Sequence, residues 1–178
     1  MTPGWVLEPE QAYKVTSRYG YRTDPVNGNT KFHAGIDIAA PAGSRIICSN
    51  DGVVTKSDWS ESEGWNVKVK HHDGFVTSYL HMLQSPEVIV GDTVYRGQLL
   101  GYLGSTGKST GNHLHFAVHD SNGASIDPVD YLNSETAPTR TMMAKAETVV
   151  KTAGSRSYMG AGAMLLVVVA AIYFSEKS

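Results

Sequence analysis

Residues 66–82 read "NVKVKHHDGFVTSYLHM", and this stretch decides the fold class. Apolar and polar residues alternate on both sides of Asp73-Gly74. Such alternation is typical of a half-buried strand, and Asp-Gly between two alternating runs is a strong signal for a β-hairpin. The stretch therefore predicts two antiparallel strands joined by a tight turn.

The same pattern of short strand-like runs separated by turns extends from Gly20 to Leu132. The runs "TVYRGQLLGYLG" and "HLHFAVHD" read as further strands, and no stretch here shows a helical period of useful length. Turn-forming groups separate the runs at short intervals: Asn27-Gly28, Pro41-Ala42-Gly43, Asp51-Gly52, Gly91-Asp92 and Asn122-Gly123. We predict an all-β domain, a compact antiparallel sheet or barrel-sandwich, over residues 15–132, after an N-terminal extension, 1–14.

Composition narrows the function classes. The formal net charge of −2 over 178 residues gives no basic excess, so nucleic acid is not an expected partner. Cys48 is the single cysteine, which excludes an intrachain disulfide and a cysteine metal cage. A metal site in this chain would have to use histidine and carboxylate ligands.

The C-terminal part of the sequence differs from the rest. Residues 159–174, "MGAGAMLLVVVAAIYF", carry no charge and would span ~24 Å as a helix, against ~30 Å of hydrocarbon. A buried helix of the soluble core is the alternative, but it would normally show a polar face. We predict a transmembrane helix over 157–175 with the lipid membrane as partner, a partly helical linker over 133–156 before it, and a tail, 176–178.

Candidate metal ligands occur in two motifs. In "GNHLHFAVHD", residues 111–120, His113 and His115 are two apart, so on a strand they point to one face with Leu114 opposite. In "FHAGIDIAAP", His33 and Asp37 are four apart and share parity if they lie on one strand. A catalytic zinc site takes three such nitrogen and oxygen ligands and leaves a position open for water, with one imidazole left for proton transfer.

Other histidines allow plainer interpretations. A single His-x-His is often a satisfied polar pair at a strand end, and His81, in "SYLHM", could be a core-edge histidine. We expect His71 and His72 to lie in solvent beside the Asp73-Gly74 turn, and His119 to be peripheral.

The motifs together resemble the lysostaphin-type (LytM-type) zinc metalloendopeptidases, which cut bacterial peptidoglycan. The resemblance covers about residues 15–132 and rests on "SRYGYRTDPVNGNTKFHAGIDIAAPAGSRI", "YLHM", "VGDTVYRGQLLGYLGSTGKSTGNHLHF" and "DPVDYL". It implies a compact antiparallel β-sheet peptidase domain with a substrate groove. It also implies site roles: His33, Asp37 and His115 bind Zn²⁺, His113 is the general base for the attacking water, and His81 holds the water or the developing oxyanion.

Three positions depart from the family pattern. Asp24-Pro25 stands where several Gly-Gly-cutting relatives carry Tyr, Ala117 where many carry Glu, and Asn112 in place of a common Pro. The first departure puts pentaglycine specificity in doubt, whereas the other two leave the metal roles intact. Residues 104–111, "GSTGKSTG", lack the order of a phosphate-binding loop and are interpreted as a flexible groove wall. Tyr19, Tyr21, Phe32 and Tyr79 could line the same groove, although aromatic residues in strands are more often core.

The expected function is hydrolysis of amide bonds in peptidoglycan stem peptides or cross-bridges. Alternatives are a catalytically silent wall-binding or scaffold module of the same fold, and a tail-anchored bacterial envelope hydrolase. The first residues, "MTPGWVLEPEQAYK", do not resemble a secretory signal, although the substrate lies outside the cytoplasm. We therefore favour an enzyme carried in the virion membrane of a bacteriophage, with other virion proteins as partners, acting during entry or exit.

Overall fold

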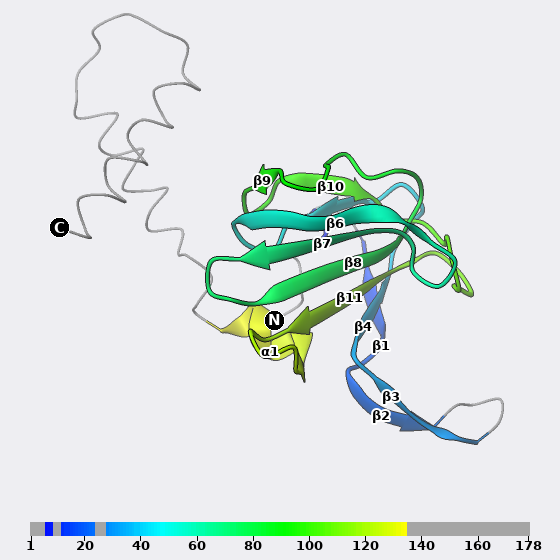
Figure 1. Ribbon diagram of the computed structural model, residues 1–178. Helices are drawn as coiled ribbons and strands as arrows, with labels where there is room; N and C mark the ends of the chain where they lie inside the picture. Colours follow the sequence, from blue (N-terminus) through cyan, green and yellow to red (C-terminus); the bar gives the residue numbers. More distant parts are fainter. Residues whose placement is uncertain (1–5, 9–11, 24–27, 135–178) are drawn as a thin grey trace, which may run out of the picture. The chain divides into compact units, whose positions relative to one another are not determined.

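The computed structural model describes residues 6–8, 12–23 and 28–134 (Figure 1). The predicted transmembrane helix and nearly all of the predicted linker lie outside these residues. Within the described part of the chain, no helix is long and apolar enough to cross a membrane. The elements are β1 (Lys14–Ser17), β2 (Gly20–Thr23), β3 (Thr30–His33), β4 (Gly35–Ala39), β5 (Arg45–Ile47), β6 (Gly52–Ser60), β7 (Gly64–His71), β8 (Val76–Met82), β9 (Thr93–Val94), β10 (Leu99–Tyr102), β11 (His113–His119), β12 (Ser125–Ile126) and α1 (Pro128–Asn133).

One large antiparallel sheet forms the body of the domain. Its strand order is β1-β4-β11-β8-β7-β6-β9, with β12 paired to β11. Two smaller sheets accompany it, β5 with β10 and β2 with β3. The β2–β3 hairpin extends away from the body (Figure 1). The predominance of antiparallel strands confirms the predicted fold class for the described domain.

The hairpin predicted from residues 66–82 is confirmed. Strands β7 and β8 pair antiparallel, and residues 72–75 connect them. The N–H of His71 donates to the carbonyl of Phe75 at 2.8 Å, and Gly74 has a φ of 89°. Glycine enters this left-handed region without the penalty that a Cβ would bring, which explains the Asp-Gly signal.

Alternation along the central strands separates the core from the other face of the sheet. On β11, Leu114, Phe116 and Val118 are fully buried, whereas His113 and His115 are only partly buried. The prediction that Leu114 points away from the two histidines is therefore confirmed. The core also includes Val6 and Leu7, and Leu7 forms a β-bridge with Ile46. Part of the expected N-terminal extension thus packs into the domain.

The expectation that His71 lies in solvent is wrong. Its side chain is only 3% exposed, because it shares the inward parity of Val67 and Val69 on β7. Both ring nitrogens have partners: Nδ1 lies 3.0 Å from the carbonyl of Asp51, and Nε2 lies 2.7 Å from the hydroxyl of Thr77. His72, one residue on, is exposed as expected.

The burial of His71 predicts acid sensitivity. Burial lowers the pKa of His71, although the Asp51 carbonyl partly opposes this shift. The unfolded chain, with a histidine pKa of about 6.5, therefore binds this proton more readily than the folded chain. The free energy of unfolding is expected to decrease as the pH falls from 7.5 to 5.5. Urea unfolding of the zinc-free protein should show a smaller decrease for His71→Gln; an equal decrease in both proteins would contradict the prediction.

One helix was not expected from the sequence. Helix α1 has six residues, which is too few to display a helical period. Its local signal is the Asp-Pro pair: Asp127 caps the helix by accepting a hydrogen bond from the Val129 N–H at 2.9 Å, and Pro128 occupies the first turn.

Candidate metal centre

Three strands bring three donor atoms together. His33 ends β3, Asp37 lies in β4, and His115 lies in β11. Asp37 Oδ1 is 2.8 Å from His115 Nδ1 and 3.2 Å from His33 Nε2, and the two imidazole nitrogens are 3.2 Å apart. The sequence analysis predicted these three residues as ligands, and the structure brings them into one group able to hold a metal ion.

The spacing of the three donors fits Zn²⁺. Tetrahedral ligands at the usual zinc distance of 2.0–2.1 Å would lie about 3.3 Å from one another. The three separations above are 2.8, 3.2 and 3.2 Å. Two imidazoles and one carboxylate form the kind of three-residue set that catalytic zinc sites use, with a fourth position open.

Strand register explains part of this convergence. Asp37 and His115 are direct partners across β4 and β11, and His113 is the partner of Ala39. Directly opposite residues point to the same face, so both histidines of β11 face the aspartate, as predicted. The expectation that His33 and Asp37 lie on one strand is wrong, because Ala34 separates β3 from β4. His33 reaches the site from the β2–β3 hairpin instead.

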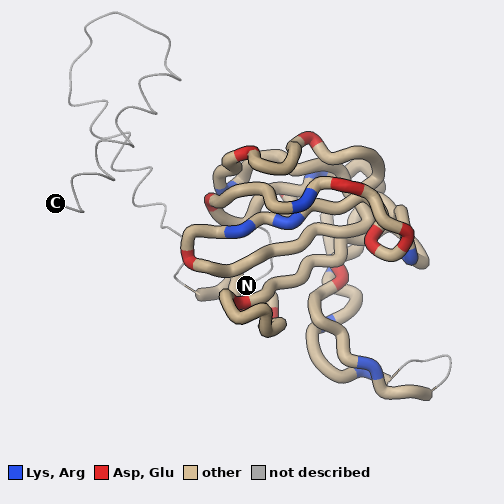
Figure 2. Tube along the Cα trace, in the orientation of Figure 1, with Lys and Arg blue, Asp and Glu red and all other residues tan. Residues whose placement is uncertain are grey.

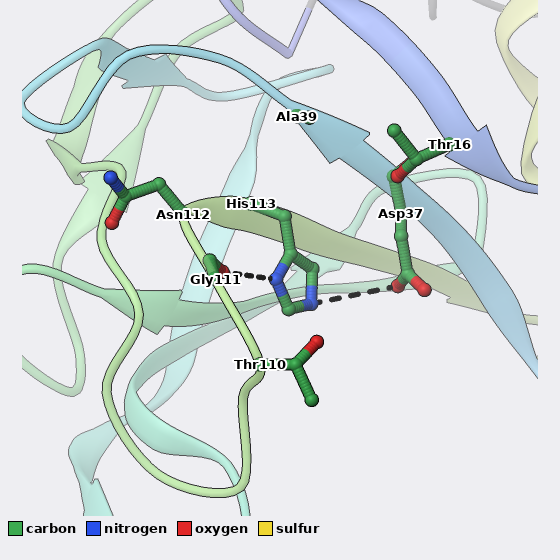
Figure 3. A pocket seen from close by; sticks show the side chains of 7 residues that line it. All are labelled: Thr16, Asp37, Ala39, Thr110, Gly111, Asn112 and His113. Carbon is green, nitrogen blue, oxygen red and sulfur yellow. Dashed lines mark hydrogen bonds and ion pairs between the residues drawn. The ribbon is translucent and has the colours of Figure 1, made fainter. Parts of the chain in front are cut away.

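Backbone carbonyls fix which nitrogen His33 and His113 present in their neutral forms. His33 Nδ1 lies 2.9 Å from the carbonyl of Arg18, and a carbonyl can only accept, so Nδ1 carries the hydrogen. The lone pair of Nε2 then points to Asp37 and His115. In His113, Nδ1 donates to the carbonyl of Gly111 at 2.8 Å, so the neutral ring presents the lone pair of Nε2, 3.8 Å from Asp37 Oδ1 (Figure 3). This arrangement suits a proton acceptor next to the three ligands.

His81 lies next to His113, on β8, which pairs with β11 on the edge opposite to β4. The two ring centroids are 4.8 Å apart, and His81 Nδ1 donates to the carbonyl of Thr106 at 2.8 Å. Its φ of 66° is unusual for a residue with a Cβ, and strained backbone of this kind clusters at functional sites. Burial lowers the pKa of His81, so at neutral pH its ring is uncharged and Nε2 can accept a hydrogen bond.

Thr106 is a supporting residue that the sequence analysis missed. Besides its carbonyl bond to His81, its hydroxyl donates to the carbonyl of Met82 at 2.6 Å and accepts from the N–H of Trp65 at 3.1 Å. Thr106 therefore holds both the His81 ring and the carbonyl of the next residue, Met82. The only sequence signal was its place in the Gly-rich run, 104–111.

The charge of Asp37 is favourable for metal binding. Burial raises the pKa of Asp37, but the neighbouring rings of His115 and His33 outweigh burial and hold the pKa well below its ordinary value. The carboxylate is thus ionised at neutral pH, as a metal ligand must be. Across the described domain, acidic and basic residues are interspersed (Figure 2).

A small hollow lies beside His113 and Asp37. Its lining is mostly neutral and polar: Thr16, Asp37, Ala39, Thr110, Gly111, Asn112 and His113 (Figure 3). The last residues of the predicted groove wall, Thr110 and Gly111, thus border the hollow. Tyr79 does not reach it, because Tyr79 is fully buried in the core. Tyr21 and Phe32 are exposed on the β2–β3 hairpin, in contact with each other.

Gly35 is a second supporting residue that the sequence analysis missed. A Cβ at this position would lie 2.6 Å from the carbonyl oxygen of Phe116 and 2.8 Å from Nε2 of His115. Both distances are below any tolerable contact, and one partner is backbone. Because Gly35 has no Cβ, β4 can approach β11 closely enough for His115 to face Asp37.

Gly35→Ala is expected to destabilise the domain by about 1–3 kcal/mol and to weaken metal binding, because the added methyl overpacks the β4–β11 contact and displaces His115. Thermal unfolding and zinc titration would measure both effects. Gly111→Ala is the matched control, since a Cβ there meets nothing within 4 Å and no left-handed φ is required. Equal stability of the two variants would contradict the prediction.

Comparison with known proteins agrees with this geometry. The family model "Peptidase family M23" matches residues 31–128. The peptidoglycan DD-endopeptidase ShyC of Vibrio cholerae is 39% identical over 117 residues, which are 65% of this chain and 27% of ShyC. The chain spans about a quarter to a third of the length of the curated relatives it matches.

Two solved structures share the fold. The catalytic domain of lysostaphin from Staphylococcus simulans matches with a TM-score of 0.62 and 30% identity, over 75% of this chain and 98% of that domain. A catalytic-domain variant of the prophage-encoded M23 protein EnpA from Enterococcus faecalis matches with a TM-score of 0.61 and 32% identity, over 72% of this chain and 98% of that domain.

Proposed function

Because the chain belongs to peptidase family M23, we propose that its β domain is a zinc-dependent endopeptidase that hydrolyses amide bonds in peptidoglycan peptides. One observation carries the proposal. His33, Asp37 and His115 place three donor atoms within 3.2 Å of one another, and Nε2 of His113 faces the same carboxylate. A three-ligand site with an adjacent base is the arrangement that metal-assisted hydrolysis requires.

His33, Asp37 and His115 would hold the zinc ion. When bound, zinc lowers the pKa of water toward about 7 and polarises the carbonyl that is attacked. His113 Nε2 accepts the proton of the attacking water, while the Gly111 carbonyl holds Nδ1 and so fixes the ring. The same ring then returns the proton to the nitrogen of the leaving amine as the amide C–N bond breaks, which restores neutral His113.

His81 has a complementary role. Its Nδ1 is committed to the Thr106 carbonyl, so in its neutral form Nε2 can only accept a hydrogen bond, as from a water molecule. A donor role for Nε2 toward negative charge on the tetrahedral oxygen would require His81 to take the proton of the attacking water in place of His113. The lowered pKa of His81 makes the neutral, water-holding form the resting state.

For the substrate class, we favour cross-links between stem peptides over pentaglycine bridges. The support is the identity with a DD-endopeptidase and the presence of Asp24-Pro25 where Gly-Gly-cutting relatives carry Tyr. The test is mass analysis of muropeptides released by the zinc-loaded chain from cross-linked walls with and without glycine bridges. Conversion of stem-peptide dimers to monomers is expected. Wall binding without release of new amines would instead support the silent binding module.

We also propose that residues 157–175 anchor the enzyme to a membrane, with a bacteriophage virion favoured over a bacterial envelope. The uncharged stretch 159–174 supports the anchor, and the likeness to a prophage-encoded M23 protein supports the viral setting. Detergent-dependent extraction of the full chain would test the anchor. Mass spectrometry of purified virions and of host membranes would separate the two locations, and absence from every particle would defeat the viral version.

A further inference from the structure

Arg22, on β2, lies next to the three proposed ligands without being one of them. Its Nη1 donates a hydrogen bond to the hydroxyl of Ser17 and lies 3.7 Å from Oδ2 of Asp37. Half of the arginine side chain is exposed. An exposed ion pair adds little stability and costs side-chain entropy, so stability alone gives a weak reason for this arrangement.

The two oxygens of Asp37 face different partners. Oδ1 points to His115 Nδ1 at 2.8 Å and to His33 Nε2 at 3.2 Å, whereas Oδ2 faces Arg22. Carboxylates bind metal ions through one oxygen or through both. An arginine on the second oxygen favours binding through the first alone. One-oxygen binding keeps open the position that a catalytic zinc site needs for water and substrate.

Ser17 extends this influence to a second ligand. Its hydroxyl lies 3.3 Å from His33 Nδ1, the same nitrogen that donates to the Arg18 carbonyl. Ser17 is also the direct partner of Asp37 across β1 and β4, next to a register shift in β1. Arg22 therefore contacts Asp37 directly and His33 through Ser17.

We propose that Arg22 is a positioning residue of the metal site, which restrains Asp37 to one-oxygen binding and, through Ser17, orients the ring of His33. The inference rests on the proposed function in taking zinc as the metal. Partners of metal ligands commonly change metal affinity by about 10–100-fold. Arginine suits the role because its planar fork offers several donors at fixed angles, whereas lysine offers a single flexible ammonium group.

Two measurements on the purified chain test this role without relying on catalysis. The first is the zinc dissociation constant, from competition with a chromophoric chelator. Arg22→Met is expected to bind zinc about 10-fold or more weakly, and Ser17→Ala to show a smaller loss. The second is the visible spectrum of the Co²⁺-loaded protein, which should weaken in Arg22→Met as Asp37 binds through both oxygens and the coordination number rises.

Two further variants separate geometry from charge. Arg22→Lys retains the charge without the fork and is expected to recover only part of the affinity. Arg96→Met removes an exposed arginine outside the metal group by the same substitution, so it should match the wild type. Circular dichroism of the zinc-free proteins checks folding, and Ser17→Ala and Arg22→Lys decide the question if Arg22→Met does not fold.

Three outcomes would overturn the proposal. The first is wild-type zinc affinity together with an unchanged cobalt spectrum in Arg22→Met. The second is an effect confined to KM, which would assign Arg22 to substrate binding. The third is an equal loss of affinity in Arg96→Met, which would indicate a general charge effect. A wild-type chain that binds zinc but cleaves no peptidoglycan would refute the proposed function while leaving the Arg22 comparison valid.

Discussion

Asp37→Ala is expected to abolish zinc binding and peptidoglycan cleavage together. Asp37 Oδ1 is the atom common to the whole site, because His33, His115 and His113 all face it, at 3.2, 2.8 and 3.8 Å. Its removal leaves two imidazoles and no anionic ligand to balance a divalent ion. Since zinc moves the pKa of water from about 15.7 to about 7, the rate of cleavage is expected to fall by more than about 10³-fold.

Metal analysis and release of new amines from purified walls would measure the two effects side by side. Asp58→Ala is the matched control, because Asp58 is a half-exposed carboxylate on β6 that pairs with Lys56 and lies outside the metal group. Chelation of the wild-type protein should reproduce the Asp37→Ala result, and added zinc should restore cleavage only in the wild type. Cleavage by a metal-free Asp37→Ala variant would disprove the proposed role.

The sequence predicted the strands because they follow from local patterns, whereas the set of three ligands came from the resemblance to the LytM-type endopeptidases. The Asp73-Gly74 hairpin has a two-residue period and a turn that glycine permits, and His113 and His115 share a strand face for the same reason. His71 shows that closeness to a turn does not ensure exposure. It precedes the Asp73-Gly74 turn, but it shares the inward parity of Val67 and Val69 and is buried with them.

The supporting residues depend on contacts between distant segments, which local patterns do not encode. Gly35 matters because β4 and β11 approach closely, and Arg22 matters because its side chain reaches from the β2–β3 hairpin to Asp37. Thr106 supports His81 across 25 positions of sequence. The meeting of His33 with Asp37 was predicted correctly from a wrong premise, since a break at Ala34 and the hairpin bring them together, not one continuous strand.

His113→Gln is expected to reduce cleavage by about 10²–10⁴-fold while retaining zinc, because glutamine preserves a polar side chain of similar reach but cannot shuttle a proton. His81→Asn should reduce cleavage less, since His81 holds water or charge and is not the first proton acceptor in the proposed mechanism. Asparagine is the appropriate replacement there because it tolerates the left-handed φ of 66°, which would strain alanine.

The pH profile separates the two histidines more sharply than the rates do. A general base must be unprotonated, so kcat/KM of the wild type should fall toward acidic pH as the base takes up a proton. That acidic limb is expected to disappear in His113→Gln and to persist in His81→Asn. In its neutral form each ring presents the lone pair of Nε2, because the carbonyls of Gly111 and Thr106 hold the opposite nitrogen of each. His113 is favoured as the base because its Nε2 faces Asp37 Oδ1. Loss of the acidic limb in His81→Asn, with its persistence in His113→Gln, would make His81 the base instead.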